Sequence, residues 1–304
     1  MRGDCMTKEQ YLKNLSFPEG RVDVVIDTDA RNEVDDQFAI AYLLKSGEKL
    51  NTVALYAAPF SFPGECTVKE GMENSYLEIL KLLELAGEKR CAFRGAESYL
   101  ESKDTPVMSD AVRDLCGRVE GYSPERPLYI IAIGALTNIA SALLASDKVR
   151  ENAVIVWLGG HGHDLGWTDE FNMRQDLLAT RIVMTSGVPL VQIPCECVAS
   201  AFAISKPELE EYLVGKNPLA DYLAKNVLDA QKNAGETKWA RVLWDVCAVG
   251  WLIDPSFTIS RVMPTYIPSD ECRYVMSEGT PESRYVCWIN RSALMTDLID
   301  KLTG

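Results

Sequence analysis

Residues 24–38 read VVIDTDARNEVDDQF. An apolar run leads directly into four aspartates within ten residues, namely Asp27, Asp29, Asp35 and Asp36. A continuous apolar run is typical of a strand buried in a parallel sheet, and loops at the carboxyl ends of such strands bind ligands. A solvent-exposed loop could also carry four charges. At this edge, however, clustered carboxylates more often bind a divalent cation, so the stretch predicts a cation site behind a buried strand.

Strand and helix patterns alternate along the rest of the chain. Strands are predicted at 22–27, 52–57, 128–133, 153–158 and 189–194, and helices at 35–45, 67–85, 136–145 and 176–186. This alternation predicts an α/β fold, with a mostly parallel, doubly wound sheet and helices on both faces. Residues 206–253 have a helical pattern, 258–289 are typical of short strands or a hairpin, and 291–302 of a closing helix. We expect one domain over residues 1–304, with 1–20 as a short helical N-terminal extension.

Composition narrows the class of protein. The chain is 47% hydrophobic and 25% charged, as in soluble globular proteins, and its net charge of -13 disfavours binding to nucleic acid or to an anionic membrane. The polar start indicates no signal peptide, and no apolar run is long enough for a membrane helix. Nine cysteines without a repeating spacing are typical of free thiols rather than of a zinc site. We therefore expect a cytoplasmic protein.

Three further polar clusters follow later strands and helices, and we expect them at the same edge of the sheet. They are IAIGALTN at 131–138, GGHGHDLGWTDEFN at 159–172 and LWDVCAVGWLIDP at 243–255. In the last cluster Asp245 stands on an otherwise apolar helical stretch, where a buried carboxylate needs a partner. It either shares a cation with the aspartate loop or is an exposed N-cap before Val246. For residues 170–172 the alternative is a surface loop that caps the next helix.

Two other aspartate motifs fit the first loop poorly. An EF-hand loop needs a central glycine and a closing glutamate, which this loop lacks. A phosphatase of the haloacid dehalogenase type would use Asp27 as nucleophile with Mg²⁺, but it needs a small turn where Ala30 and Arg31 stand. Phosphate-binding glycine loops and the Gly-x-Ser-x-Gly motif are absent from the sequence.

Taken together and in order, the four clusters resemble the motifs of the nucleoside hydrolase family, of the inosine-uridine preferring type. DTDARNEVDD is similar to the family's Asp-Thr-Asp-Pro-Gly-Ile-Asp-Asp, GALTN to its Gly-Pro-Leu-Thr-Asn, EFN to its Glu-Phe-Asn, and WDVCAV to its His-Asp-x-x-Ala. The resemblance covers residues 22 to about 255. It implies the doubly wound fold that the alternation already predicts.

The resemblance implies Ca²⁺-dependent hydrolysis of the N-glycosidic bond of purine or pyrimidine ribonucleosides, giving ribose and free base in nucleoside metabolism such as purine salvage. Carried over, the Ca²⁺ ligands are Asp29, Asp36, Asp245 and the carbonyl oxygen of Ile133, with Asp29 also the general base. The substrate ligands are Asp35, Glu170 and Asn172, and Asp27 orients the loop. The implied partner is a small nucleoside or another N-riboside, bound by a homo-oligomer, either a dimer or a tetramer.

The departures from the family pattern concern the sugar and base contacts. Two extra residues lie between Asp29 and Asp35, so that Arg31 or Asn32 could face the ligand, and Asp164 stands near an expected asparagine. Trp244 replaces the histidine linked to protonation of the leaving base. Two substitutes are open, stacking of the base on Trp244 or Trp167 and proton donation by His161 or His163. A member that binds calcium and a ribosyl ligand without catalysis is the remaining alternative, and the nucleobase stays open.

Overall fold

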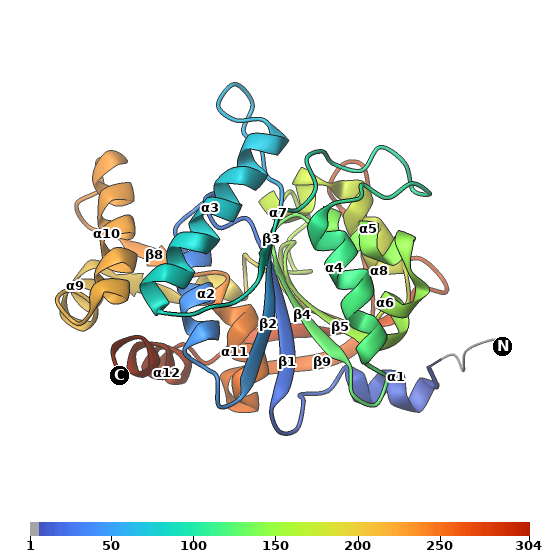
Figure 1. Cartoon of the computed structure of the whole chain (residues 1–304). Coiled ribbons are helices and arrows are strands. Elements are labelled where there is room, and N and C mark those ends of the chain that lie inside the picture. The colour runs from blue at the N-terminus through green and yellow to red at the C-terminus, as the bar shows by residue number, and fades with distance from the viewer. Residues whose placement is uncertain (1–5) are drawn as a thin grey trace.

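The computed structural model describes residues 6–304 and is built on an eight-stranded sheet in the order β3-β2-β1-β4-β5-β6-β12-β9 (Figure 1). Neighbouring strands from β3 to β12 run parallel, and β9 runs antiparallel to β12. The predicted mostly parallel α/β sheet is therefore confirmed. The strands are β1 Val22–Thr28, β2 Leu50–Ala57, β3 Ala92–Phe93, β4 Leu128–Ile133, β5 Ala153–Leu158, β6 Leu190–Ile193, β9 Thr258–Pro264 and β12 Glu282–Ile289.

Helices cover both faces of the sheet because its strands are apolar on both sides. In β1, Val24 and Ile26 face one core and Val25 faces the other. The first core holds α2 (Asp36–Leu44), α11 (Val246–Ile253) and α12 (Arg291–Thr303), and the second holds α4 (Asp110–Arg118), α5 (Thr137–Ala145) and α8 (Leu177–Thr185) (Figure 1). All residues of β4 and β5 are buried, as expected of strands covered twice.

The remaining elements lie around this frame. Helix α3, predicted from residue 67, begins with a capping box of Thr67 and Glu70. Helix α1 lies in the expected N-terminal extension and is fastened by Asn14, which donates to the Pro124 carbonyl oxygen at 2.9 Å; residues 1–5 lie outside the described part. The bounds are α1 Lys8–Asn14, α3 Val68–Ala86, α6 Asp147–Asn152, α7 Phe171–Gln175, α9 Lys206–Tyr212, α10 Pro218–Asn233, β7 Ala203–Ser205, β8 Ala240–Val242, β10 Ile267–Pro268 and β11 Tyr274–Val275.

The helical pattern predicted over 206–253 is right for α9, α10 and α11 but missed a strand, β8. Helices α9 and α10 are separate, and β8 follows them and pairs antiparallel with β7. Gly215, at a φ of 78°, allows the turn between the helices, and Asn217 caps α10 by accepting from the Ala220 amide. Residues 258–289 do form strands, with β9 and β12 paired in the main sheet and the small β10–β11 hairpin between them.

The strand order places a ligand-binding crevice between β1 and β4. The chain winds from β1 outwards to β2 and β3, then returns to the other side of β1 with β4. Loops after β1 and β4 therefore diverge to opposite faces and leave a crevice at their carboxyl ends. Asp29 follows β1, and Gly134 follows β4. Within residues 6–304, no helix combines the length and the apolar character needed to cross a membrane.

Candidate active site

A cavity of about 260 Å³ opens at the carboxyl ends of β1, β4, β5 and β6. It brings together side chains from all four polar clusters of the sequence. Its lining consists of Asp29, Asn32, Glu33, Asp35, Asp36, Ile133, Leu158, His161, Asp169, Glu170, Phe171, Asn172, Arg174, Cys195, Glu196, Trp244 and Asp245.

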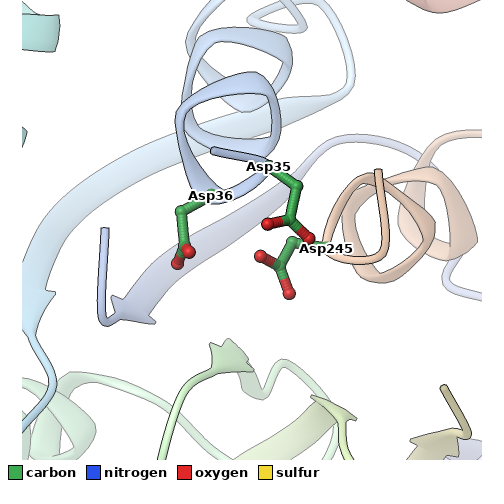
Figure 2. A group of neighbouring side chains, drawn as sticks. All are labelled: Asp35, Asp36 and Asp245. Carbon is green, nitrogen blue, oxygen red and sulfur yellow. The ribbon is translucent and has the colours of Figure 1, made fainter. Parts of the chain in front are cut away.

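Three buried aspartates form the floor of this cavity. Asp35 and Asp36 start helix α2, Asp245 starts helix α11, and carboxylate oxygens of the three lie within 4.8 Å of one another (Figure 2). Asp35 and Asp245 each occupy an N-cap position, yet neither side chain accepts a capping hydrogen bond from its helix. Aspartate at an N-cap normally does so. Here the carboxylates turn towards one another, at the positive ends of two helix dipoles.

Crowding and burial make this floor electrostatically costly. Burial raises the pKa of Asp29, Asp36 and Asp245 well above the usual range, and the negative charges of neighbouring aspartates raise it further. Burial, followed by the charge of Glu33, raises the pKa of Asp35 to about 7. Like charges held together in this way are stabilised by a cation. A donor set made only of oxygen fits a hard divalent ion, and Ile133, the expected carbonyl ligand, also lines the cavity.

Asp29 lies beside this floor in a turn of its own. The Arg31 and Asn32 amides both donate to the Asp29 carbonyl oxygen, at 2.6 and 2.8 Å, and the Asn32 side chain donates to Oδ2 of Asp29 at 3.3 Å. Asn32 and Glu33 thus line the cavity, whereas Arg31 lies 3.7 Å from Glu78 in an ion pair. The two extra residues of this loop bring Asn32, not Arg31, to the cavity.

Asp27 supports the loop from beneath the cavity. It is fully buried, and its Oδ1 accepts from the Asn138 side chain at 2.8 Å, while burial raises its pKa to about 7. The same Asn138 amide nitrogen lies 3.1 Å from the Ala57 carbonyl oxygen, so it joins the loops after β1 and β2. Asp27 is outside the cavity lining, which removes the nucleophile that a dehalogenase-type phosphatase requires. No role was predicted from the sequence for Asn138 of GALTN. A polar residue in an otherwise apolar helix could have indicated one.

Glu170 and Asn172 approach the cavity from the third cluster. Glu170 is buried and caps α7, accepting from the amides of Asn172 at 2.9 Å and Met173 at 3.0 Å, and from Gly160 at 2.8 Å. Asn172 donates to the Leu158 carbonyl oxygen at 3.1 Å. The alternative of a surface loop is half right, because Glu170 caps the helix but does so from a buried position in the cavity wall.

The aromatic and imidazole candidates separate in space. Trp244 and His161 line the cavity, and Trp167 lies outside the lining with its ring edge-on to His161 at 4.5 Å. His163 is stacked between Tyr266 and Tyr285, at 4.5 and 4.2 Å, away from the cavity, and burial lowers its pKa to about 4.

Three expected site residues therefore lie outside the cavity lining, namely His163, Trp167 and Asp164, and Asp164 is exposed on the surface. The backbone conformation of this glycine-rich loop decides whether His161 or His163 faces the cavity. The sequence spacing of the two histidines does not determine that conformation. The lining also contains residues that the sequence did not single out, among them Asp169, Arg174, Cys195 and Glu196. Only their closeness in sequence to the ends of predicted strands could have indicated that they line the cavity.

Comparisons with known proteins agree with this architecture. A family model described as inosine-uridine preferring nucleoside hydrolase matches residues 24–279. The pyrimidine-specific ribonucleoside hydrolase RihA of Citrobacter koseri is 32% identical over 257 residues, which cover 75% of this chain and 79% of that protein. A shorter match, to RihA of Salmonella typhimurium, is 28% identical over 144 residues and covers 45% of this chain and 46% of that protein.

Solved structures show the same fold. A plant nucleoside hydrolase superposes with a TM-score of 0.74 at 21% identity, covering 94% of this chain and 100% of that one. A purine-preferring ribonucleoside hydrolase from Gardnerella vaginalis has a TM-score of 0.71 at 19% identity, covering 93% of this chain and 98% of that one. The extent of the family match and the identity to the Citrobacter relative settle the assignment. The chain belongs to the inosine-uridine preferring nucleoside hydrolase family and is thus a hydrolase of the class that acts on N-glycosidic bonds.

Proposed function

We propose that the protein hydrolyses the N-glycosidic bond of ribosides with the help of a bound Ca²⁺. The observation that carries the proposal is the buried floor of the cavity, where Asp35 and Asp245 leave their own helix ends uncapped to face each other (Figure 2). Two unused caps cost stability, each on the order of 1 kcal/mol. A bound cation offsets that cost, and a role in cation binding explains why the two carboxylates lie there.

The residues that would hold the cation are Asp29, Asp36, Asp245 and the Ile133 carbonyl oxygen, with Asp35 close by. All five residues line the cavity, and the four aspartates are buried. Thr28 donates to Oδ1 of Asp36 at 2.6 Å, which fixes the orientation of that carboxylate. When bound, the cation makes nearby water more acidic and neutralises part of the floor's charge.

Asp29 is the group that would accept the proton of the attacking water. It is the aspartate held apart from the cluster of three, and the Asn32 amide on its Oδ2 orients the carboxylate. A general base must lie beside the water and have a free lone pair. Oδ1 of Asp29 has no protein donor among the hydrogen bonds of the described residues, and it supplies that lone pair.

Binding of the sugar falls to Asp35, Asn172 and Glu170. Asp35 and Asn172 both line the cavity, and both offer polar atoms to hydroxyl groups. The Glu170 carboxylate is already engaged by three backbone amides, so it supplies a fixed negative wall rather than a mobile acid. Its role is to accept a hydrogen bond from a sugar hydroxyl and to hold α7 in place.

The departing base would lie against Trp244. This residue precedes Asp245, so it stands at the edge of the floor and contributes an aromatic wall to the cavity. His161 is the second group within reach. Its Nδ1 accepts from the Glu196 amide at 3.3 Å, and burial lowers its pKa, so at neutral pH the ring is neutral with its proton on Nε2.

The test is a panel of purine and pyrimidine ribonucleosides assayed for free ribose, with and without chelator. We expect ribose release that stops on chelation and returns with Ca²⁺. Binding of ribosides without ribose release would favour the non-catalytic alternative. Relatives named as pyrimidine-specific and as purine-preferring both match this chain, so the panel must include both classes of base.

We also propose that the protein is a homo-oligomer and acts in the cytoplasm. Support for self-association comes from the open edge of the sheet at β9. Ile259 on β9 and Trp288 on β12 are cross-strand partners, exposed by 57% and 47%. An exposed apolar pair shared by an edge strand and its neighbour is suited to contact with a second copy. Light scattering of the wild type and of Trp288→Lys measures the state, and we expect a smaller mass for the variant.

A further inference from the structure

The outer wall of the cavity carries negative charge that its own cations do not balance. Three acidic residues lie there, Glu33, Asp169 and Glu196. Glu33 is paired with Arg241, and Asp169 with Arg174 at 3.2 Å. Glu196 is exposed and forms no ion pair among residues 6–304. Asp29 and the three aspartates of the floor also line the cavity, and a divalent cation offsets only two of these four carboxylate charges. The cavity therefore keeps a net negative field even with the cation bound.

The same cavity has few groups that can give a proton to a leaving base. Arg174 is the sole basic side chain in its described lining apart from His161, and a guanidinium does not release its proton. His161 is neutral at neutral pH because burial lowers its pKa, and its Nδ1 accepts from the Glu196 amide. A neutral nucleobase that leaves with the bonding electron pair becomes an anion and needs a proton. The outer wall of the cavity offers negative charge and no proton donor for that step.

Trp244 adds an aromatic face to this wall. An indole ring attracts cations by its quadrupole, more strongly than other aromatic side chains do, and the attraction grows where water is excluded. Trp244 is partly buried and packs against the core beneath the floor. An indole face and an unpaired carboxylate in one cavity form a site suited to a delocalised, flat cation.

We infer, resting on the proposed riboside hydrolysis, that the preferred substrate carries a positive charge on its base, as in an N-ribosyl pyridinium or a 7-alkyl purine riboside. Water forms the new bond to C1′ of the ribose and gives its proton to Asp29. The C1′–N bond breaks, and its electron pair stays on the nitrogen and cancels the positive charge. The base leaves neutral. No acid is needed for that step, which fits a cavity with Trp244 and Glu196 but without a protonated histidine.

The experiment compares cationic and neutral substrates across variants. The probes are nicotinamide riboside and 7-methylguanosine as cations, and guanosine and uridine as neutral nucleosides. Because a cationic base departs faster in any enzyme, the readout is the change in the cation-to-neutral ratio of kcat/KM between variants. The variants are Glu196→Gln and Trp244→Leu, with Glu211→Gln as control, since Glu211 is an exposed carboxylate on α9 outside the cavity lining.

We expect Glu196→Gln to lower the ratio about fivefold, the size of one partly exposed charge interaction. Trp244→Leu should lower it by a similar or larger factor, of the order of fivefold or more. Glu211→Gln should leave the ratio as in the wild type. Added salt should raise KM for the cationic probes more than for the neutral ones.

Two results would overturn the inference in different ways. Equal ratios in wild type, Glu196→Gln and Trp244→Leu, with neutral nucleosides hydrolysed well, would refute a cationic substrate and leave riboside hydrolysis standing. Failure of the wild type to release ribose from any of the four probes in the presence of Ca²⁺ would refute the proposed function, and this inference with it. Circular dichroism of each variant separates a change in selectivity from loss of fold.

Discussion

Single residues in this site depart from their ordinary structural roles. Asp35 and Asp245 sit where a helix cap belongs and cap nothing, and Asp27 keeps one carboxylate oxygen buried without a hydrogen-bond partner. Each departure is costly by itself. All three residues lie in or beneath one cavity, which indicates that the lost stability is connected with the function of that cavity.

Asp29→Asn tests the general base. The amide keeps the shape of the side chain and its contact with Asn32 but cannot accept the proton of water. We expect the fold and most of the ribose affinity to remain while kcat falls by about two or more orders of magnitude. Steady-state kinetics and riboside binding by calorimetry measure the two effects. Near-normal turnover in the variant would place the base elsewhere.

Asp36→Asn tests the cation site with a readout other than activity. Removing one carboxylate from the floor should weaken Ca²⁺ binding by about two orders of magnitude, measured by calorimetry. In chelator, the variant should melt at a higher temperature than the wild type, because it no longer buries that charge. Asp164→Asn is the matched control, an exposed aspartate of the neighbouring loop, and should change neither quantity. A lower melting temperature for Asp36→Asn in chelator would contradict the electrostatic account.

At the scale of elements, the sequence predicted what local pattern determines. The apolar runs predicted β1, β2, β4, β5 and β6, and the helical pattern over residues 67–85 predicted α3. Helix α4 was missed, and β7 and β8 were missed because strands of three residues depend on a partner from another part of the chain. The break before α10 could have been read from Gly215 and Pro218, which are a turn and a helix start.

Helix packing near the site depends on one glycine. A Cβ on Gly71 of α3 would lie 1.9 Å from the carbonyl oxygen of Phe60, in the segment that follows β2. We expect Gly71→Ala to destabilise the fold by about 1–3 kcal/mol, since a backbone atom must move. Gly117→Ala in α4, where nothing lies within 4 Å, should instead stabilise by about 0.5–1 kcal/mol. Denaturant unfolding of both variants checks the contrast, and equal effects would mean that α3 shifts freely.

For the whole molecule, the net charge of -13 is partly concentrated in one place. The sequence predicted which segments meet, because strand order and motif order together fix the edge of the sheet on which they lie. It did not predict which carboxylates face each other. Side-chain rotation at the first residue of a helix is set by the neighbours it meets in three dimensions, and Asp35 meets Asp245 only after folding.

The stabilisation by calcium should depend on pH. Burial raises the pKa of Asp27 and Asp35 to about 7. A raised folded-state pKa gives stability that is complete below the unfolded value of about 4 and is lost as pH rises towards about 7. In chelator, the melting temperature should therefore fall between about pH 5 and pH 8. With Ca²⁺ the floor is ionised and compensated, so the calcium-induced rise in melting temperature should be larger at pH 8 than at pH 5, as scanning calorimetry can show. A rise that is independent of pH would contradict this linkage.

The placement of Asp36 and Asp245 at distant points of the chain also sets a kinetic order. Asp36 begins the first helix after β1, whereas Asp245 is reached only after β6 and helices α9 and α10. A growing or refolding chain cannot present both until these two distant segments have docked. Calcium should therefore bind only after the protein has folded. It should leave the refolding rate nearly unchanged and slow unfolding, with loss of the cation as the first step of unfolding.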